Sequence, residues 1–129
     1  MRILLDTHVW LWMLVSPDRI GREAREELAD RENNLVLSAA SSWEIAIKYR
    51  LGKLPLPEPP GEFIPPRLAR DGIVPLPIEH AHATRVADLP ELHRDPFDRL
   101  LVAQAQLEDL TIFTADDKLA RYDVSCVLV

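Results

Sequence analysis

Four carboxylic acids lie at or shortly after the ends of short apolar segments. These acids are Asp6, Glu44, Asp98 and Asp116. The apolar segments predict β-strands, and open α/β sheets bind ligands beyond the carboxyl ends of their strands, where residues distant in sequence meet. A cluster of acids needs a cation to offset its charge, and oxygen-only ligands favour Mg²⁺ or Mn²⁺ over Zn²⁺. The pattern therefore predicts a divalent metal site and hydrolysis of phosphodiester bonds.

Two of these acids also have a purely structural interpretation. Asp6 could cap the helix that is expected to begin at Thr7. Glu44 lies three residues after Ser41, which is the spacing of a capping box, and Lys48 is one turn further along. Taken singly, neither acid distinguishes a metal site from helix capping.

The later acids fit the structural interpretation less well. Asp98 stands three residues after Asp95, and two carboxylates at one helix start repel each other unless a donor or a cation lies between them. Thr114 could cap Asp117, which leaves Asp116 without a structural role. Four acids at the same end of a parallel sheet are explained better by a joint site than by four separate caps.

Strands and helices alternate along the chain, which predicts a doubly wound parallel sheet. Strands are expected at Ile3–Leu5, Leu35–Leu37, Gly72–Leu76, Thr111–Thr114 and Val124–Val129. Helices are expected at Thr7–Val15, Gly21–Glu32, Ser41–Leu51, Phe63–Arg70, Ile78–Leu89, Phe97–Leu107 and Asp117–Tyr122. The strand before Pro77 contains Pro75 and should be short or near an edge. Between Pro55 and Pro77, eight of the eleven prolines predict a surface excursion with one short helix.

Composition bounds the class of protein. A length of 129 residues suits one domain, and 47% hydrophobic with 28% charged residues is typical of a globular protein. The net charge of −6 argues against binding nucleic acid through the overall field. The single cysteine, Cys126, cannot form an internal disulfide and is expected to be a buried thiol. Without a signal-peptide pattern or an apolar segment long enough to cross a bilayer, we expect a cytoplasmic protein with no membrane partner.

Other chemistries lack their motifs. There is no glycine-rich phosphate loop, no G-x-S-x-G elbow and no cysteine cluster for zinc. His80 and His82 are two residues apart in a predicted helix, face different directions and are expected at the surface. His8 and His93 lie near candidate acids, where lone histidines usually serve packing or hydrogen bonding.

Four segments together resemble a PIN domain, and more narrowly the VapC-type toxin ribonucleases of bacterial toxin–antitoxin pairs. The segments are LLDTHVWLW, SSWEIAIKYRLGKL, RDPFDRLLVAQAQ and TIFTADDKL. The resemblance spans residues 1–129, treated as one PIN domain, and implies a three-layer α/β/α fold. It also implies a Mg²⁺- or Mn²⁺-dependent endoribonuclease that acts on RNA, forms a homodimer and is inhibited by a cognate VapB-like antitoxin.

The resemblance also assigns residues by position. Asp6, Glu44, Asp98 and Asp116 become the catalytic and metal-binding acids. Thr114 becomes a group that orients a carboxylate or a water, whereas Asp95 and Asp117 take capping or outer roles, with Asp117 as the substitute if Asp116 points away. Water attack in line with the leaving group would release a 5′-phosphate.

An acidic protein that cleaves RNA needs local cations. The candidates for contacts with the RNA backbone are Lys48, Arg50, Lys53, Arg94, Arg99 and Lys118. Two other functions compete with the nuclease. An aspartate-nucleophile phosphatase is disfavoured because such enzymes need an acid two residues after the first, where this chain has His8. The second is a catalytically weak PIN-fold module that binds RNA or protein.

Overall fold

Five strands form one sheet in which every pairing is parallel. The computed structural model describes residues 1–129. The strands are β1 (Arg2–Leu5), β2 (Asn34–Ser38), β3 (Val74–Leu76), β4 (Thr111–Thr114) and β5 (Cys126–Leu128), in the spatial order β3-β2-β1-β4-β5. The predicted parallel sheet is confirmed, and the strand with Pro75 lies at an edge, where a missing N–H costs least.

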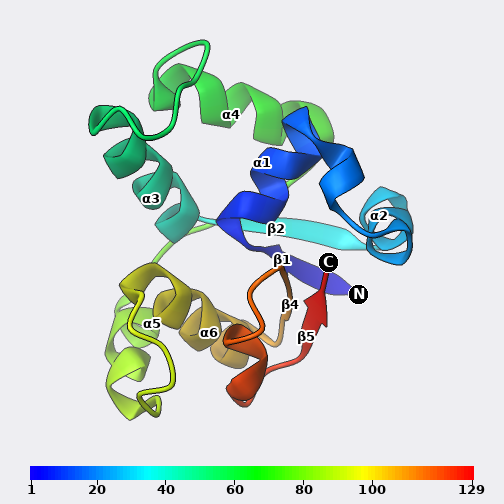
Figure 1. Cartoon of the computed structure of the whole chain (residues 1–129). Coiled ribbons are helices and arrows are strands. Elements are labelled where there is room, and N and C mark those ends of the chain that lie inside the picture. The colour runs from blue at the N-terminus through cyan, green and yellow to red at the C-terminus, as the bar shows by residue number, and fades with distance from the viewer.

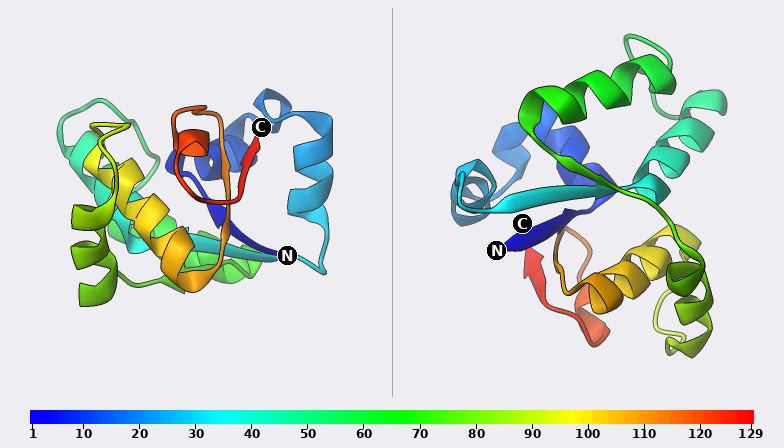
Figure 2. Two further views of the ribbon diagram at one scale, coloured as in Figure 1. Left: turned by 90° about the horizontal axis from the view of Figure 1, so that it is seen from below. Right: turned by 180° about the vertical axis from the view of Figure 1, so that it is seen from behind.

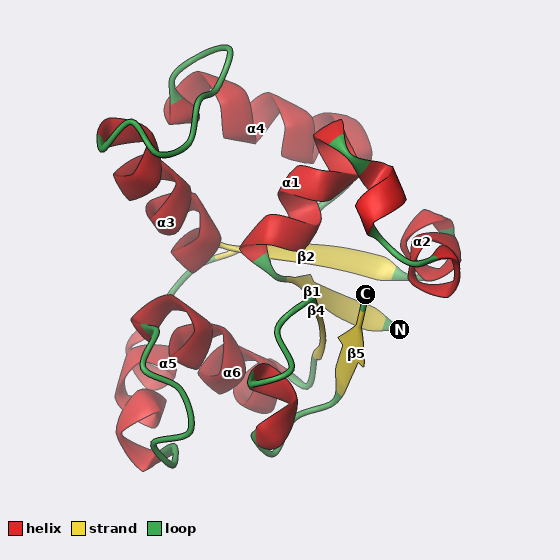
Figure 3. Cartoon of the chain, in the orientation of Figure 1, coloured by secondary structure: helices red, strands yellow, loops and turns green.

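Helices cover both faces of this sheet (Figure 1). They are α1 (Thr7–Val15), α2 (Arg22–Ala29), α3 (Ala39–Arg50), α4 (Pro60–Asp71), α5 (His80–Arg85) and α6 (Pro96–Glu108), with short 3₁₀ turns η1 (Pro17–Arg19), η2 (Val86–Asp88) and η3 (Leu119–Arg121). Both views in Figure 2 place α5 and α6 together, and Figure 3 shows the strands as a middle layer between helices. None of the helices has the length and hydrophobicity that a membrane-spanning segment needs.

Strand β1 explains the two hydrophobic cores. Ile3 and Leu5 pack into a cluster with residues of α1, α2 and α4, whereas Leu4 packs into a second cluster with residues of α6. Alternate side chains of a strand point to opposite faces, so a strand between two helix layers is apolar at every position. The α/β/α arrangement therefore follows from the uninterrupted apolar run.

The strand order creates a crevice between β1 and β4. From β1 the chain passes first to β2 and β3 on one side and later to β4 and β5 on the other. A doubly wound sheet opens a crevice at the carboxyl ends of strands where the order reverses. Asp6 directly follows β1, and Asp116 lies two residues beyond β4.

The proline-rich segment is more regular than predicted. Instead of a short helix, α4 runs for 12 residues and contains Pro65 and Pro66. Both prolines are exposed, while Phe63, Ile64 and Leu68 on the same helix are buried in the core. The burial of the apolar face offsets the lost backbone hydrogen bonds.

Other elements are shorter than expected. The second helix covers only Arg22–Ala29, and the fifth covers only His80–Arg85 before it tightens into η2. The segment after Asp117 forms only the turn η3. Cys126 is partly buried, and that burial raises the pKa of its thiol.

Candidate metal centre

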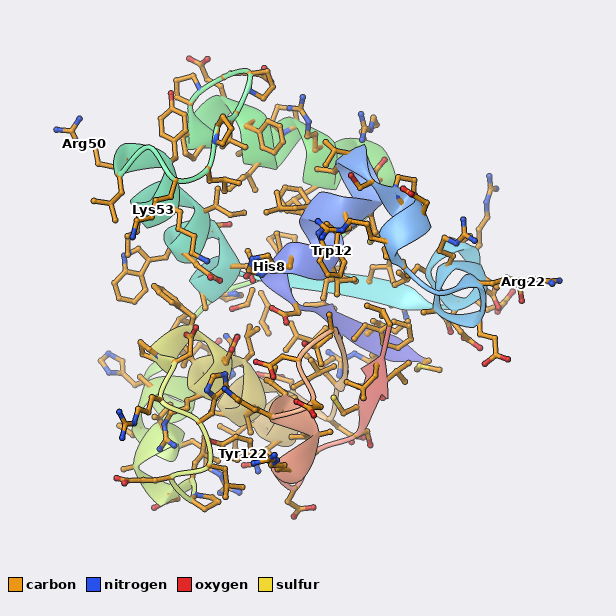
Figure 4. The ribbon with its side chains drawn as sticks, viewed as in Figure 1. His8, Trp12, Arg22, Arg50, Lys53 and Tyr122 are labelled. Carbon is orange, nitrogen blue, oxygen red and sulfur yellow. The ribbon has the colours of Figure 1, made fainter.

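A cavity of about 390 Å³ lies at the carboxyl ends of the strands. Its lining includes all four predicted acids, two further acids and two histidines: Asp6, Glu44, Asp95, Asp98, Asp116, Asp117, His8 and His93. The cavity also contains Trp12 and Lys48, and Figure 4 shows His8 and Trp12 near each other on α1. The structure therefore brings together residues from four separate parts of the chain.

Asp6 does not cap α1, although it occupies the N-cap position. Its Oδ2 instead accepts a hydrogen bond of 2.5 Å from the Thr114 hydroxyl. The side chain is buried, which raises the pKa of its carboxyl group, and the Thr114 hydrogen bond acts in the opposite direction. The helix-capping interpretation of Asp6 is wrong, and its carboxylate is directed to the end of β4.

Thr114 links two of the acids. Besides donating to Asp6, its Oγ1 accepts a hydrogen bond from the backbone N–H of Asp116 at 3.0 Å. The expected Thr114 cap on Asp117 is therefore wrong. Asp116 does have a structural role, because its Oδ1 accepts from the Lys118 backbone N–H at 2.9 Å. Asp117 is exposed and lies at the rim of the cavity.

Asp95 and Asp98 have different roles at the start of α6. The Asp95 carboxylate caps the helix by accepting from the backbone N–H groups of Phe97 and Asp98. Asp98 is thereby free to point into the cavity, where burial raises its pKa to about 7, with Asp6 and Asp95 as further causes. Burial and neighbouring negative charge both oppose ionisation of the Asp98 carboxyl group, so the cavity disfavours its charged form in the absence of a cation.

His93 belongs to the site, although the sequence analysis did not include it among the site residues. Its Nε2 lies 2.8 Å from Asp98 Oδ2 and 3.2 Å from Asp116 Oδ2. One potential ligand atom from each of these three residues lies within 4.8 Å of the others. Its position five residues before Asp98 was the only available signal, because Asp116 is distant in the sequence.

Glu44 reaches the cavity from α3. This helix begins earlier than predicted, with Ser38 as its N-cap, so Ser41 forms no capping box with Glu44. Ser41 accepts a hydrogen bond from Thr7 instead. Lys48 Nζ lies 2.6 Å from Glu44 Oε2, and the Glu44 side chain is only 7% exposed, so this is not an ordinary surface ion pair.

One of the candidate RNA-binding cations, Arg99, is held by hydrogen bonds within the protein. The Arg99 guanidinium donates to the carbonyl oxygens of Pro90, Val86 and Leu89 and to the Tyr122 hydroxyl. These bonds hold the segment before α6 and account for Arg99 without RNA.

The remaining candidates differ in position. Lys48 lines the acidic cavity, whereas Lys53, Arg94 and Lys118 are exposed. Arg50 is also exposed, lines neither this cavity nor the one next to it and extends outward (Figure 4), so we no longer expect it to contact RNA held at the cavity.

His82 is buried, so the expectation that it lies at the surface is wrong. Its Nδ1 accepts from the Glu79 backbone N–H, and its Nε2 lies 2.8 Å from Glu108 Oε1. The three tryptophans also differ: Trp10 is fully buried, Trp12 is half-buried at the cavity, and Trp43 is 57% exposed beside Phe97.

The comparisons with known proteins agree with this geometry. The family model for the PIN domain matches residues 3–125. The chain belongs to the PIN domain family. Over 60 residues, this PIN domain is 55% identical to Ribonuclease VapC16 of Mycobacterium tuberculosis. That match covers 46% of the chain and less than half of the relative, 43% of its length.

Solved structures with the same fold cover nearly the whole PIN domain. VapBC2 from Rickettsia felis, bound to a promoter DNA fragment, has a TM-score of 0.74 at 18% identity and covers 99% of this chain and 98% of its own. A toxin–antitoxin complex from Klebsiella pneumoniae has a TM-score of 0.62 at 18% identity, covering 97% and 95%. FitAcB from Neisseria gonorrhoeae has a TM-score of 0.59 at 21% identity, covering 96% and 95%. At these identities the likeness shows the fold.

Proposed function

We propose that this PIN domain is a divalent-metal-dependent endoribonuclease and the toxin of a bacterial toxin–antitoxin pair. The observation that carries the proposal is the meeting of Asp6, Glu44, Asp98 and Asp116 in one cavity. The 55% identity to a named ribonuclease over 60 residues supports RNA as the substrate. The proposed site of action is the cytoplasm.

The residues fit a hard divalent cation. Three aspartates supply carboxylate oxygens, burial raises the pKa of Asp6 and Asp98, and a positive ion would relieve that cost. Asp6, Asp98 and Asp116 would hold the cation, with Glu44 as a further candidate ligand, and Mg²⁺ or Mn²⁺ would suit this oxygen-rich donor set. When bound, such a cation would lower the pKa of a water and offset negative charge on the scissile phosphate.

The protein's own groups divide the remaining tasks. Glu44, held by Lys48 at 2.6 Å, orients the attacking water and accepts its proton. Thr114 fixes the Asp6 carboxylate and the backbone of Asp116 through a single hydroxyl. In-line attack leaves the phosphate on the 5′ side of the downstream fragment. Asp117 is the substitute acid if Asp116 keeps its turn-forming role.

Partners follow from related structures and from one exposed surface. The neighbours with the same fold include a structure described as a toxin–antitoxin complex, and we extend a VapB-like antitoxin partner to this chain. Trp43 and Ile47 on α3 and its C-cap residue Leu51 recur every four residues and are all exposed. We assign this stripe to contact with a second copy of the chain, and Trp43→Glu should shift the oligomeric mass measured by light scattering from dimer to monomer.

The decisive experiment compares cleavage of single-stranded RNA by the wild type and by Asp98→Asn, with Mg²⁺ or Mn²⁺ and with chelator. We expect cleavage only by the wild type and only with metal. Asp88→Asn is the matched control, because it removes the same charge from an exposed position outside the cavity. Equal activity of wild type and Asp98→Asn would reject the nuclease and leave the binding module.

A further inference from the structure

A second cavity of about 280 Å³ adjoins the acidic one and shares His8 and Lys48 with it. Its remaining lining includes Lys53 and the apolar side chains of Leu11, Ile45 and Leu54. We propose that this basic annex, named for His8, Lys48 and Lys53, binds the nucleotide next to the scissile phosphate of single-stranded RNA. The proposal rests on the nuclease function and adds a second subsite to it.

The two cavities have opposite charge. Six carboxylates line the acidic cavity, whereas no carboxylate lines the annex. An RNA chain carries a phosphate at every nucleotide, and successive phosphates are separated by a sugar. When the scissile phosphate lies at a metal held by the acids, the adjacent phosphate therefore lies outside that metal site. The adjacent phosphate needs a positive neighbour, because otherwise the surplus carboxylates repel it. The annex supplies that neighbour at the shared wall.

Lys53 is the group best suited to hold this phosphate. Lys48 is already paired with Glu44 at 2.6 Å, so part of its charge is offset. Lys53 is exposed and takes part in none of the ion pairs of the structure. Lys53 lies just after α3 and lines the annex, while Arg50, the last residue of α3, extends outward (Figure 4).

The floor of the annex suits an unpaired base. Ile45 is fully buried, and Leu11 and Leu54 are partly buried against the core. An apolar floor below a cationic rim matches a nucleotide, whose base is flat and largely apolar on its faces and whose phosphate is charged. A base that is still paired in a duplex could not enter, so the annex selects single-stranded RNA.

A segment of a partner protein is the competing occupant. Leu11 and Leu54 also line a neighbouring apolar groove that extends toward α4, so an apolar peptide could continue into the annex. The observations favour RNA, because the annex opens into the acidic cavity through His8 and Lys48 and because its charged lining is entirely basic.

The test compares Lys53→Gln with Arg50→Gln, which removes a cation from the same helix end but lines neither cavity. On a single-stranded oligoribonucleotide, Lys53→Gln should raise KM and leave kcat unchanged, and Arg50→Gln should change neither. The slope of log affinity against log salt should fall by about 0.7 for Lys53→Gln, the value for one lost phosphate contact with a single strand. A dinucleoside monophosphate has only the scissile phosphate, so its kcat/KM should be the same for all three proteins.

The result that overturns the annex is an equal KM and salt slope for Lys53→Gln and Arg50→Gln. A loss of antitoxin binding by Lys53→Gln with unchanged RNA binding would also overturn it and identify the peptide as the occupant. Fluorescence anisotropy with the same oligoribonucleotide on Asp98→Asn separates this test from the nuclease test, because binding needs no turnover. Adding Lys53→Gln to Asp98→Asn should weaken that binding even if the wild type cleaves no RNA.

Discussion

Helices α1 and α6 begin in the same way, yet the acids at their N-caps do different work. Asp6 and Asp95 both have extended backbones and both precede a helix that borders the acidic cavity. The Asp95 carboxylate accepts two backbone N–H groups of its own helix. The Asp6 carboxylate makes no capping hydrogen bond and instead accepts one from Thr114, more than 100 residues away in the sequence.

We interpret this difference as separating an acid that caps its helix from one that serves the proposed metal site. A capping aspartate stabilises a helix by about 1 kcal/mol, and α1 forgoes that contribution. Asp6 is also buried, and its carboxyl pKa is raised, so its position is costly to the metal-free fold. Asp6 neither caps its helix nor ionises easily where it is buried. A bound cation that interacts with its carboxylate is the best explanation for both features.

The largest effect should come from substituting the two acids identically. Asp6→Asn should lower RNA cleavage on the order of 100-fold or more, because it removes a charged ligand atom from the proposed metal site. Asp95→Asn removes the same charge but keeps a residue that caps well, and should retain most activity. Cleavage rates measured at saturating metal test both. Equal losses would erase the contrast between the two helix starts.

Stability sharpens the same contrast. Without metal, Asp6→Asn should melt at the same temperature as the wild type or above it, because the neutral amide has no charge whose burial is unfavourable. A lower melting temperature for Asp6→Asn than for Asp95→Asn, measured with chelator, would show that Asp6 mainly supports the fold.

The next effect concerns the hydroxyl that holds Asp6 in place. Thr114→Val keeps the shape but leaves Asp6 Oδ2 and the Asp116 backbone N–H without their partner. We expect cleavage to fall by about 10- to 100-fold, the usual cost of losing a group that orients a metal ligand. Thr114→Ser retains the hydroxyl and should recover most of the rate. A Thr114→Val enzyme with wild-type rates would show that Asp6 needs no positioning.

Stability should also depend on pH through Asp98. Its folded pKa is about 7, well above the ordinary aspartate value of 3.8, so between these two pH values the folded state holds a proton that the unfolded state has released. The free energy of unfolding of the metal-free protein should therefore fall as the pH rises from 4 to 7. The raised pKa of Asp6 acts in the same direction.

Thermal melts in chelator across this range measure that slope, and Asp98→Asn should flatten it. Adding Mg²⁺ or Mn²⁺ should raise the melting temperature most at pH 7 and above, where the carboxylates are ionised and can bind the cation. A slope that is the same in Asp98→Asn and wild type would assign the pH dependence to other groups.

The sequence was sufficient for the sheet and for the convergence of the acids, because both follow from local patterns. Continuous apolar runs identify strands buried on both faces, and acids after such strands meet at one edge. His82 was wrongly expected at the surface, and the hydrogen-bonding partners of His93 could not be named, because the environments of both residues depend on Glu108, Asp98 and Asp116, whose placement requires the fold. Local pattern also could not show that an apolar face would keep α4 helical through two prolines.

The smallest effect should come from removing the cap that Asp95 provides. Asp95→Ala leaves the N–H groups of Phe97 and Asp98 without their acceptor and should lower the free energy of unfolding by about 1 kcal/mol in denaturant titrations. Asp95→Asn should restore that stability, because an amide oxygen caps as well as a carboxylate. Both variants remove a negative charge near Asp98, and Asp95 helps to raise the pKa of Asp98. A change in the pH dependence of stability that both variants show is therefore caused by the lost charge and not by the lost cap. A difference between them confined to stability would place Asp95 in the helix cap, and a shared collapse of cleavage would place it beside Asp6 among the metal ligands.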